Sequence, residues 1–226
     1  DLHLHKAAKR SVLTQALGVM IKIIVYLLLV TASLTTMSCA AQEDASPTAC
    51  PSRSADNYYF SPGALDPTNE RSDAFVRDWY SKHLSAMDEP SISCGSPGEV
   101  YRFTWLRTFH HPVAVRITNH GTRVILQAIE LDGAGGYEPG KVLRRTQKTL
   151  SVKEFENLTS AFSQAKFDLI PTDEKRDGLD GAEWIVETSS NDIYHLVVRW
   201  SPNSGPIREI GSRFLTLTGW KFDEVY

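Results

Sequence analysis

Apolar side chains recur at helical spacing in three stretches of the chain. The first follows Asp66 or Thr68, either of which can cap a helix. The second begins with Ser151 and Glu154 at the spacing of a capping box, and the third spans 207–220. We therefore expect three helices. The apolar face of the first is expected to contain Phe75, Val76, Trp79, Tyr80, Leu84 and Met87.

Between these stretches, apolar and polar residues alternate in the pattern of β-strands. Asn119-His120-Gly121 is typical of a hairpin turn, and a glycine-rich turn follows at 132–140. Hairpins that alternate with a few helices predict an α+β domain, in which an antiparallel sheet carries about three helices on one face. The expected strands are 100–106, 113–118, 124–131, 141–150, 183–188 and 193–200.

The last of these hairpins has charged residues at alternate positions. With a loop at 190–192, Glu187 would lie opposite His195, and Glu183 would lie opposite Arg199 on the same face. Opposite charges across strands contribute roughly 0.2–1 kcal/mol, so a solvated sheet face explains the pattern, while an acid–base pair would also need a cleft. The core-facing side would hold Trp184, Val186, Leu196, Val198 and Trp200.

The densest group of carboxylates is Asp177, Asp180 and Glu183, in the sequence RDGLDGAEW. Loops rich in carboxylates can bind calcium, but the alternating acidic positions of an EF-hand are absent. The Asp-Gly pairs are equally explained as turn residues. Together with the hairpin, these residues define a candidate binding surface, which consists of Asp177, Asp180, Glu183, Glu187, His195, Arg199 and Trp200.

No catalytic residue, cofactor or metal site is predicted from the other motifs. His110 and His111 are adjacent, so on a strand they would point to opposite faces and could not bind one metal ion together. Adding His120 does not produce a zinc-site spacing. The net charge of −3, from 24 Lys and Arg against 27 Asp and Glu, argues against a nucleic-acid partner.

The segment 20–41, MIKIIVYLLLVTASLTTMSCAA, has the order of a bacterial export signal: a lysine, an apolar core and then small residues. Its core is shorter than the about 20 apolar residues that a membrane-spanning helix needs. The chain is accordingly divided into an over-extended N-terminus (1–19) before an expected start at Met20, the signal (20–39), a flexible tether (40–66) and a single α+β domain (67–226).

The sequence Ser-Cys-Ala around Cys39 resembles the lipobox of bacterial lipoproteins. The resemblance implies that Cys39 carries a lipid, which would hold an exported protein to the membrane, facing the periplasm from the outer membrane. Cleavage after Ala40 or Ala41, which would give a secreted protein, and an uncleaved anchor are the alternatives. With Cys39 lipidated, Cys50 and Cys94 remain as a candidate disulfide, and two free thiols are the other reading.

The tether contains one aromatic cluster. Its Ser, Pro, Ala and Asp residues bury little surface, which favours flexibility. Tyr58, Tyr59 and Phe60 interrupt this composition. We expect these rings to dock on the folded domain rather than to bind a ligand.

Three segments resemble a group of bacterial exported proteins. They are the capped Leu-Ser-Val-Lys-Glu-Phe helix start, Asp-Gly-Ala-Glu-Trp at 180–184 and Tyr-His-Leu-Val-Val-Arg-Trp-Ser-Pro at 194–202. The resemblance covers 100–220 and implies the same small α+β domain. It implies no activity, because that group has none established.

These observations leave three functions open. The first is a membrane-tethered binding domain that takes a protein or another envelope component at the candidate binding surface. The second is a hydrolase-like or metal-assisted enzyme that uses His195 with Asp180, Glu183 or Glu187. The third is an inhibitor or immunity-type protein. A pocket that gathers His195 with the carboxylates would favour the enzyme, whereas an exposed sheet face would favour binding.

Overall fold

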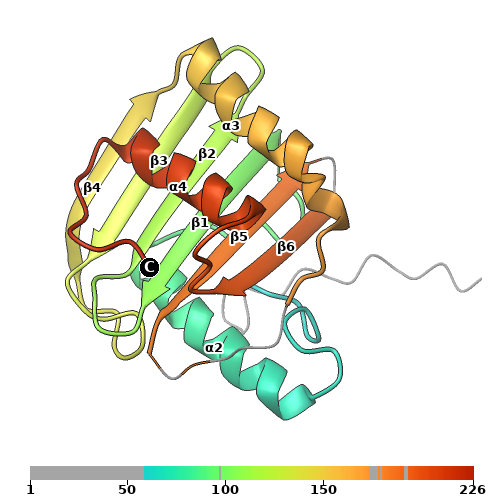
Figure 1. The fold of residues 1–226 in the computed structure, drawn as a ribbon, viewed down its shortest axis with the longest axis vertical. Coiled ribbons are helices and arrows are strands. Elements are labelled where there is room, and N and C mark those ends of the chain that lie inside the picture. The colour runs from blue at the N-terminus through green and yellow to red at the C-terminus, as the bar shows by residue number, and fades with distance from the viewer. Residues whose placement is uncertain (1–58, 97, 174–177, 179, 191–192) are drawn as a thin grey trace, which may run out of the picture. The chain divides into compact units, whose positions relative to one another are not determined.

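A computed structural model describes residues 59–96, 98–173, 178, 180–190 and 193–226. These residues belong to one compact unit that spans Ala49–Tyr226, while the expected signal, Cys39, Cys50 and Asp177 lie outside the described residues. The helices are α2 (Glu70–Ala86), α3 (Val152–Ala165), the short 3-10 helix η1 (Phe167–Leu169) and α4 (Pro206–Thr218) (Figure 1). The strands are β1 (Glu99–Arg107), β2 (Val113–Asn119), β3 (Val124–Leu131), β4 (Val142–Thr149), β5 (Ala182–Ser190) and β6 (Ile193–Trp200).

The described strands form a 6-stranded sheet in the order β4-β3-β2-β1-β5-β6. Every neighbouring pair is antiparallel, and β1 lies at the centre, between β2 and β5. The α+β fold expected from the sequence is confirmed, because hairpins and helices alternate along the chain as the periodicity indicated.

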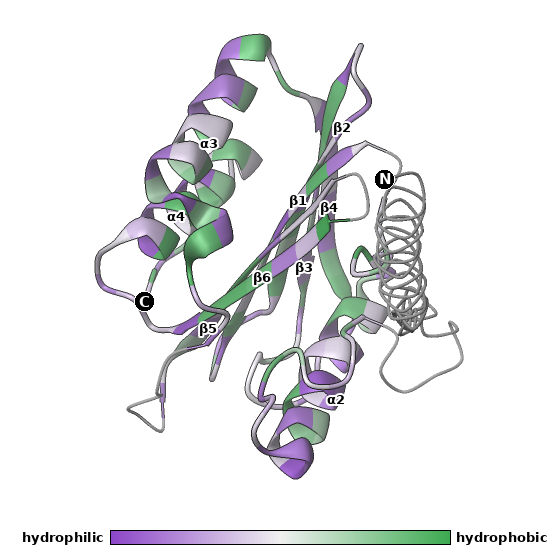
Figure 2. Ribbon diagram, turned by 90° about the vertical axis from the view of Figure 1, so that its right-hand side faces the viewer, coloured by the Kyte–Doolittle hydropathy of each residue, from purple (hydrophilic) through white to green (hydrophobic). Residues whose placement is uncertain are grey.

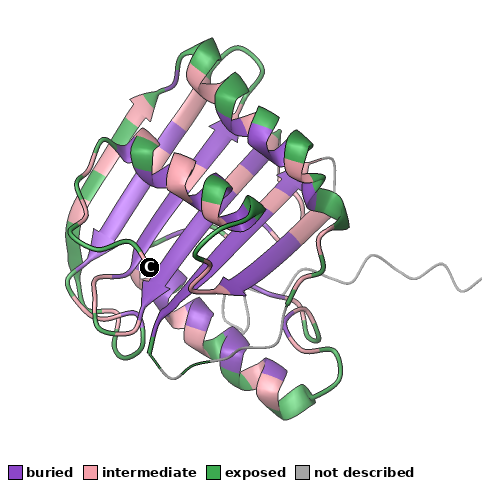
Figure 3. Cartoon of the chain, viewed as in Figure 1, coloured by how far each residue is buried: buried purple, intermediate pink, exposed green. Residues whose placement is uncertain are grey.

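Helices cover both faces of the sheet, which corrects the expectation of one covered face. α3 and α4 pack on one face and α2 packs on the other (Figure 2). The reason lies in the central strands, whose two sides are both buried: Phe103 packs with the α3 and α4 cluster, and Leu106 packs with the α2 cluster. Burial is concentrated in these strands, whereas β4 at one edge of the sheet is largely exposed (Figure 3).

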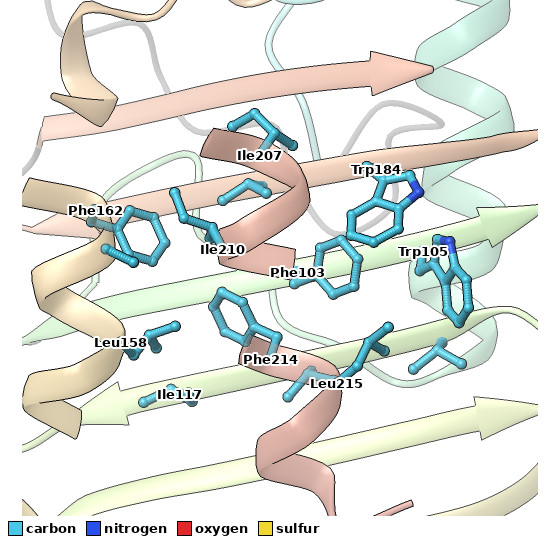
Figure 4. Packing of buried hydrophobic residues seen from close by; sticks show 14 of the residues in the cluster. Phe103, Trp105, Ile117, Leu158, Phe162, Trp184, Ile207, Ile210, Phe214 and Leu215 are labelled. Atoms are coloured by element: carbon cyan, nitrogen blue, oxygen red, sulfur yellow. The ribbon is translucent and has the colours of Figure 1, made fainter. Parts of the chain in front are cut away.

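The face under α3 and α4, here called the aromatic face, is closed by packed rings (Figure 4). The Phe103 ring centroid lies 5.2 Å from that of Trp184 and 5.9 Å from that of Phe214 in α4. α4 approaches this closely because residue 211 is glycine: a Cβ at Gly211 would lie 2.4 Å from two ring atoms of Trp184. Other members of this cluster are Trp105, Ile117, Leu158, Phe162, Ile207, Ile210 and Leu215.

The opposite face, here called the α2 face, is covered by α2 and by the segment that precedes it. Tyr59 and Phe60 are buried there, which confirms the expected docking of these two rings, while Tyr58 lies outside the described residues. The core thus includes residues that precede position 67. Of the expected apolar face of α2, Phe75 is 71% exposed, whereas the buried positions are Val76, Tyr80, Leu84 and Met87.

The helix caps follow the sequence for α3 but not for α2. Ser151 and Glu154 form the expected capping box. α2 is capped by Asn69, whose side chain accepts a hydrogen bond from the backbone N–H three residues later. Asp66 instead accepts hydrogen bonds from the backbone and hydroxyl of Thr68, in a turn before the helix. A local turn therefore delays the start of α2.

Candidate functional site

The last hairpin pairs in a register one residue away from the expected one. Glu187 lies opposite Leu196 rather than His195. β5 continues to Ser190 and β6 begins at Ile193, so fewer residues separate the strands than the expected pairing assumed. Successive side chains of a strand point to opposite faces of the sheet. A shift of one residue therefore places side chains of β5 and β6 that were expected on the same face on opposite faces.

As a result, the candidate binding surface is divided between the two faces of the sheet. Glu183 and Glu187 lie on the α2 face and are 0% exposed. His195 and Arg199 lie on the aromatic face, and Asp180 is exposed beside the start of β5. The expected pairs of Glu187 with His195 and of Glu183 with Arg199 are therefore wrong, and the described residues do not gather into one surface or into an acid–base pair.

Glu187 instead forms a buried ion pair with Arg102. The Nε and Nη2 atoms of Arg102 each donate to a carboxylate oxygen at 2.6 Å, and the Tyr194 hydroxyl donates to Glu187 at 2.8 Å. Burial opposes the charge of Arg102, but Glu187 outweighs it and raises the pKa of Arg102 above its usual value. Burial, followed by the charge of Glu187, also raises the pKa of Tyr194 well above its usual value.

A second ion pair extends this arrangement to the segment after α2. The Nε atom of Arg116 donates to the carboxylate of Glu89 at 2.8 Å, and Arg102 Nη1 donates to the carbonyl oxygen of Pro90 at 2.7 Å. We call Arg102, Glu187, Glu89 and Arg116 the charge network of the α2 face. Its side chains satisfy one another, so it fastens the segment after α2 to the sheet.

Arg199 and Gly181 lie in two of the segments used for the sequence resemblance, and both make contacts that hold the structure around β6. Arg199 donates to the carbonyl oxygens of Pro171 and Thr172 at 3.0 and 3.2 Å, which fastens that segment along β6. Trp200 packs against Gly181, where a Cβ would lie 2.7 Å from an indole carbon. The glycine of this Asp-Gly pair is therefore required by the close approach of the indole.

A cleft of about 360 Å³ lies where the segment after α4 crosses the end of β1. This is within the range of roughly 300–1,000 Å³ that is usual for small-ligand sites. His110 and His111 both contribute to it, because they lie in the turn after β1 and not on a strand, which corrects the reading that they face opposite sides. The C-terminal cleft, as we call it, is lined by Arg107, Phe109, His110, His111, Glu130, Leu143, Arg144, Lys221, Phe222 and Asp223.

Arg107 is the most deeply buried cation of the C-terminal cleft, at 4% exposure. Its guanidinium carbon lies 4.0 Å from the ring centroid of Trp105. Nη1 and Nη2 donate to the carbonyl oxygens of Glu224 and His111 at 3.1 and 3.2 Å, and Nε has no acceptor among the described residues. Burial lowers the pKa of Arg107 from its usual value. Its hydrogen-bond acceptors are neutral oxygens, and the negative charges of Tyr226 and of nearby carboxylates only partly offset the effect of burial on its pKa.

Glu130, the buried carboxylate of the cleft, is already engaged. Arg144 Nε donates to it in a short hydrogen bond, and His111 Nδ1 lies 3.4 Å from its other oxygen. The ring centroid of Phe222 lies 5.8 Å from the guanidinium of Arg107 and 5.6 Å from that of Arg144. Since Glu130 compensates Arg144, Arg107 is the cation best placed to attract an anionic ligand.

Apolar side chains are exposed around the cleft. The rings of Phe109 and Tyr137 stack with centroids 6.1 Å apart. Leu143 lines the cleft and Val142 precedes it in β4, and all four side chains are exposed. A group of exposed apolar side chains beside a cationic cleft is typical of a binding site.

Sequence reasoning missed this cleft because its residues come from three strands, the turn after β1 and the C-terminal segment. The adjacent histidines were the one local signal. Among the described residues, no group of three or more His, Cys, Asp or Glu side chains is placed to hold a metal ion. No helix in the described part of the chain is both long and apolar enough to cross a bilayer.

Comparison with known proteins gives no assignment: no protein family matches this chain, and no curated protein matches it either. Cys94 is disulfide-bonded. The expected pairing with Cys50 stays a prediction, because Cys50 lies outside the described residues.

Proposed function

We propose that the chain is a binding domain held at the bacterial envelope by a lipid on Cys39, and that the C-terminal cleft binds an anionic group of its ligand. The observation that carries the proposal is Arg107, a buried guanidinium whose described hydrogen-bond acceptors are neutral oxygens. Buried charges are normally paired, so this one attracts a counter-ion. Carboxylates and phosphates match a guanidinium best.

The chemistry of the cleft supports binding over catalysis. The described lining includes no Ser, Thr or Cys side chain to act as a nucleophile, and Glu130 is engaged by Arg144. The enzyme hypothesis relied on His195, whose Nε2 lies 3.0 Å from the carbonyl oxygen of Ile170. Glu183 points to the other face of the sheet, so this pair lends the enzyme hypothesis no support.

Titration of the full chain with succinate tests the anion site. We expect the ring signals of His110 and His111, which line the cleft, to shift in NMR spectra and to saturate as the dicarboxylate binds. Arg107→Gln should weaken binding about tenfold or more, because hydrogen bonds to charged groups contribute roughly 1.5–3 kcal/mol.

The matched control is Arg213→Gln, which removes a guanidinium that pairs with Glu209 on the surface of α4. It should leave succinate binding unchanged. Arg144→Gln provides a second cleft variant if Arg107→Gln does not fold. Shifts that never saturate, or that persist equally in both cleft variants, would contradict the proposed site.

Mass spectrometry of the mature N-terminus tests the proposed anchor separately. A diacylglycerol on Cys39 is expected. A mature protein that begins with unmodified Ala41 or Gln42 would overturn the lipid anchor and leave the cleft proposal intact.

A further inference from the structure

The two edges of the sheet differ in how their backbone groups are satisfied. At the β6 edge, the backbone N–H of Val198 donates to the carbonyl oxygen of Thr172 at 2.6 Å, so a neighbouring segment protects it. The outer side of β4 has no such backbone partner among the described residues. An edge strand of this kind can accept a further strand.

The backbone groups that face outward from β4 follow from the pairing with β3. The N–H of Leu150 donates to the carbonyl oxygen of Val124, and hydrogen-bonded pairs alternate with non-bonded pairs along an antiparallel ladder. The N–H and C=O groups of Arg145, Gln147 and Thr149 therefore point away from β3. These outward N–H and C=O groups can form hydrogen bonds with an added strand at the spacing usual between neighbouring strands.

The charge of β4 selects an acidic partner. The strand VLRRTQKT carries two arginines and a lysine and contains no acidic residue. Arg145 donates to the carbonyl oxygen of Met87, a neutral group. Arg144 and Lys148 already pair with Glu130 and Glu154, so among the described residues Arg145 is the β4 cation that lacks a carboxylate partner. An acidic residue in an added segment would complement it.

The β4 edge is continuous with the C-terminal cleft. Leu143 and Arg144, at the start of β4, line the cleft. A strand added to β4 would reach the cleft at this end, with exposed Phe109 and Val142 available to its apolar side chains. One ligand can thus use the outward backbone groups, the basic strand and Arg107 together.

We infer that the ligand is an extended acidic peptide that adds to the sheet beside β4 and places a carboxylate in the C-terminal cleft. This inference rests on the proposed function and names the ligand class of the same site. Main-chain hydrogen bonds to β4 would supply affinity, and the cleft would select the position of the carboxylate.

Displayed random peptides selected on the full chain provide the probe. The enriched peptides should alternate apolar residues with Asp or Glu. A synthetic copy should bind Gln147→Pro about tenfold or more weakly, because proline removes one outward N–H and obstructs the edge. The control Gln147→Ala removes the same side chain but keeps the N–H, and it should bind as the unchanged chain does.

Hydrogen exchange gives a second measurement that does not depend on a variant. The amides of Arg145, Gln147 and Thr149 should exchange fast in the free chain and slowly with peptide bound. Three results would each overturn the inference. They are equal binding to Gln147→Pro and Gln147→Ala, a selection that enriches no acidic peptide, and amides that a second copy or the chain's own tether already protects in the free protein. Succinate binding that depends on Arg107 would survive such a result, so failure here is distinct from failure of the proposed function.

Discussion

Both faces of the sheet have an apolar core, but the α2 face also contains a buried ion pair. On the aromatic face, Phe103, Trp184 and Phe214 are packed ring against ring. On the α2 face, Arg102 and Glu187 are equally buried, yet they form an ion pair. Loss of apolar packing costs stability in proportion to what is removed, whereas a buried pair that loses one member leaves an uncompensated charge. Burial alone therefore does not indicate how a position will respond to substitution.

The largest effect is expected from Arg102→Met, which leaves the buried carboxylate of Glu187 without its counter-charge. Breaking such a pair costs about 3–5 kcal/mol. The free energy of unfolding, measured by urea denaturation of the full chain, should fall by this amount.

The double variant Arg102→Met/Glu187→Leu sharpens the comparison. It removes both charges and keeps the volume filled, so most of the lost stability should return. If the losses of the two single variants simply add, these positions behave as ordinary packing positions and the distinction between the faces is wrong.

On the aromatic face, Gly211→Ala is expected to lose about 1–3 kcal/mol through overpacking. The added Cβ would meet the Trp184 ring at 2.4 Å, although alanine favours a helix. The neighbouring Ser212→Ala is the control and should be nearly neutral. In a variant that carries both Gly211→Ala and Arg102→Met, the two losses in free energy of unfolding should add, because the two sites lie on opposite faces of the sheet. A stabilised Gly211→Ala variant would disprove the close packing of α4.

The helix caps offer a matched pair, one on each face. Ser151→Ala removes the capping box of α3, and Asn69→Ala removes the single cap of α2. Each should lower the free energy of unfolding by about 1 kcal/mol, with the larger loss at Ser151, where two hydrogen bonds are affected. A larger loss at Asn69 would indicate that α2 depends more on its cap than on its buried face.

The smallest effect at neutral pH concerns His83, which is buried in α2 with Nδ1 2.9 Å from the carbonyl oxygen of Trp79. Burial lowers the pKa of His83 from its usual 6.5. As the pH falls, His83 therefore binds a proton in the unfolded chain before it does so in the folded chain. The stability that is present above about pH 6.5 is lost as the pH falls toward the pKa of the folded state. His83→Gln should reduce the fall in urea midpoint between about pH 7 and 5. An unchanged slope would exclude His83 as the cause.

Local elements of the fold were predictable because their signals lie within a few residues of one another. The capping box of Ser151 and Glu154 is such a signal, and the strand pattern around Asn119-His120-Gly121 is another. The site was not predictable in this way. Arg107, Glu130 and Lys221 are far apart in the sequence, and only the sheet and the segment after α4 bring them to one cleft.

By itself, the sequence determined the α+β class, the order of hairpins and helices and the position of the α3 cap, because periodicity and caps depend on neighbouring residues. Tertiary structure decided which face each side chain occupies. A shift of one residue in the pairing of β5 with β6 placed Glu187 and His195 on opposite faces of the sheet. α2 packed on the face that the hydrophobic pattern had predicted to be exposed to solvent. The physical reason is that strand pairing and helix packing are long-range choices, made by loop length and by the burial of residues from distant segments.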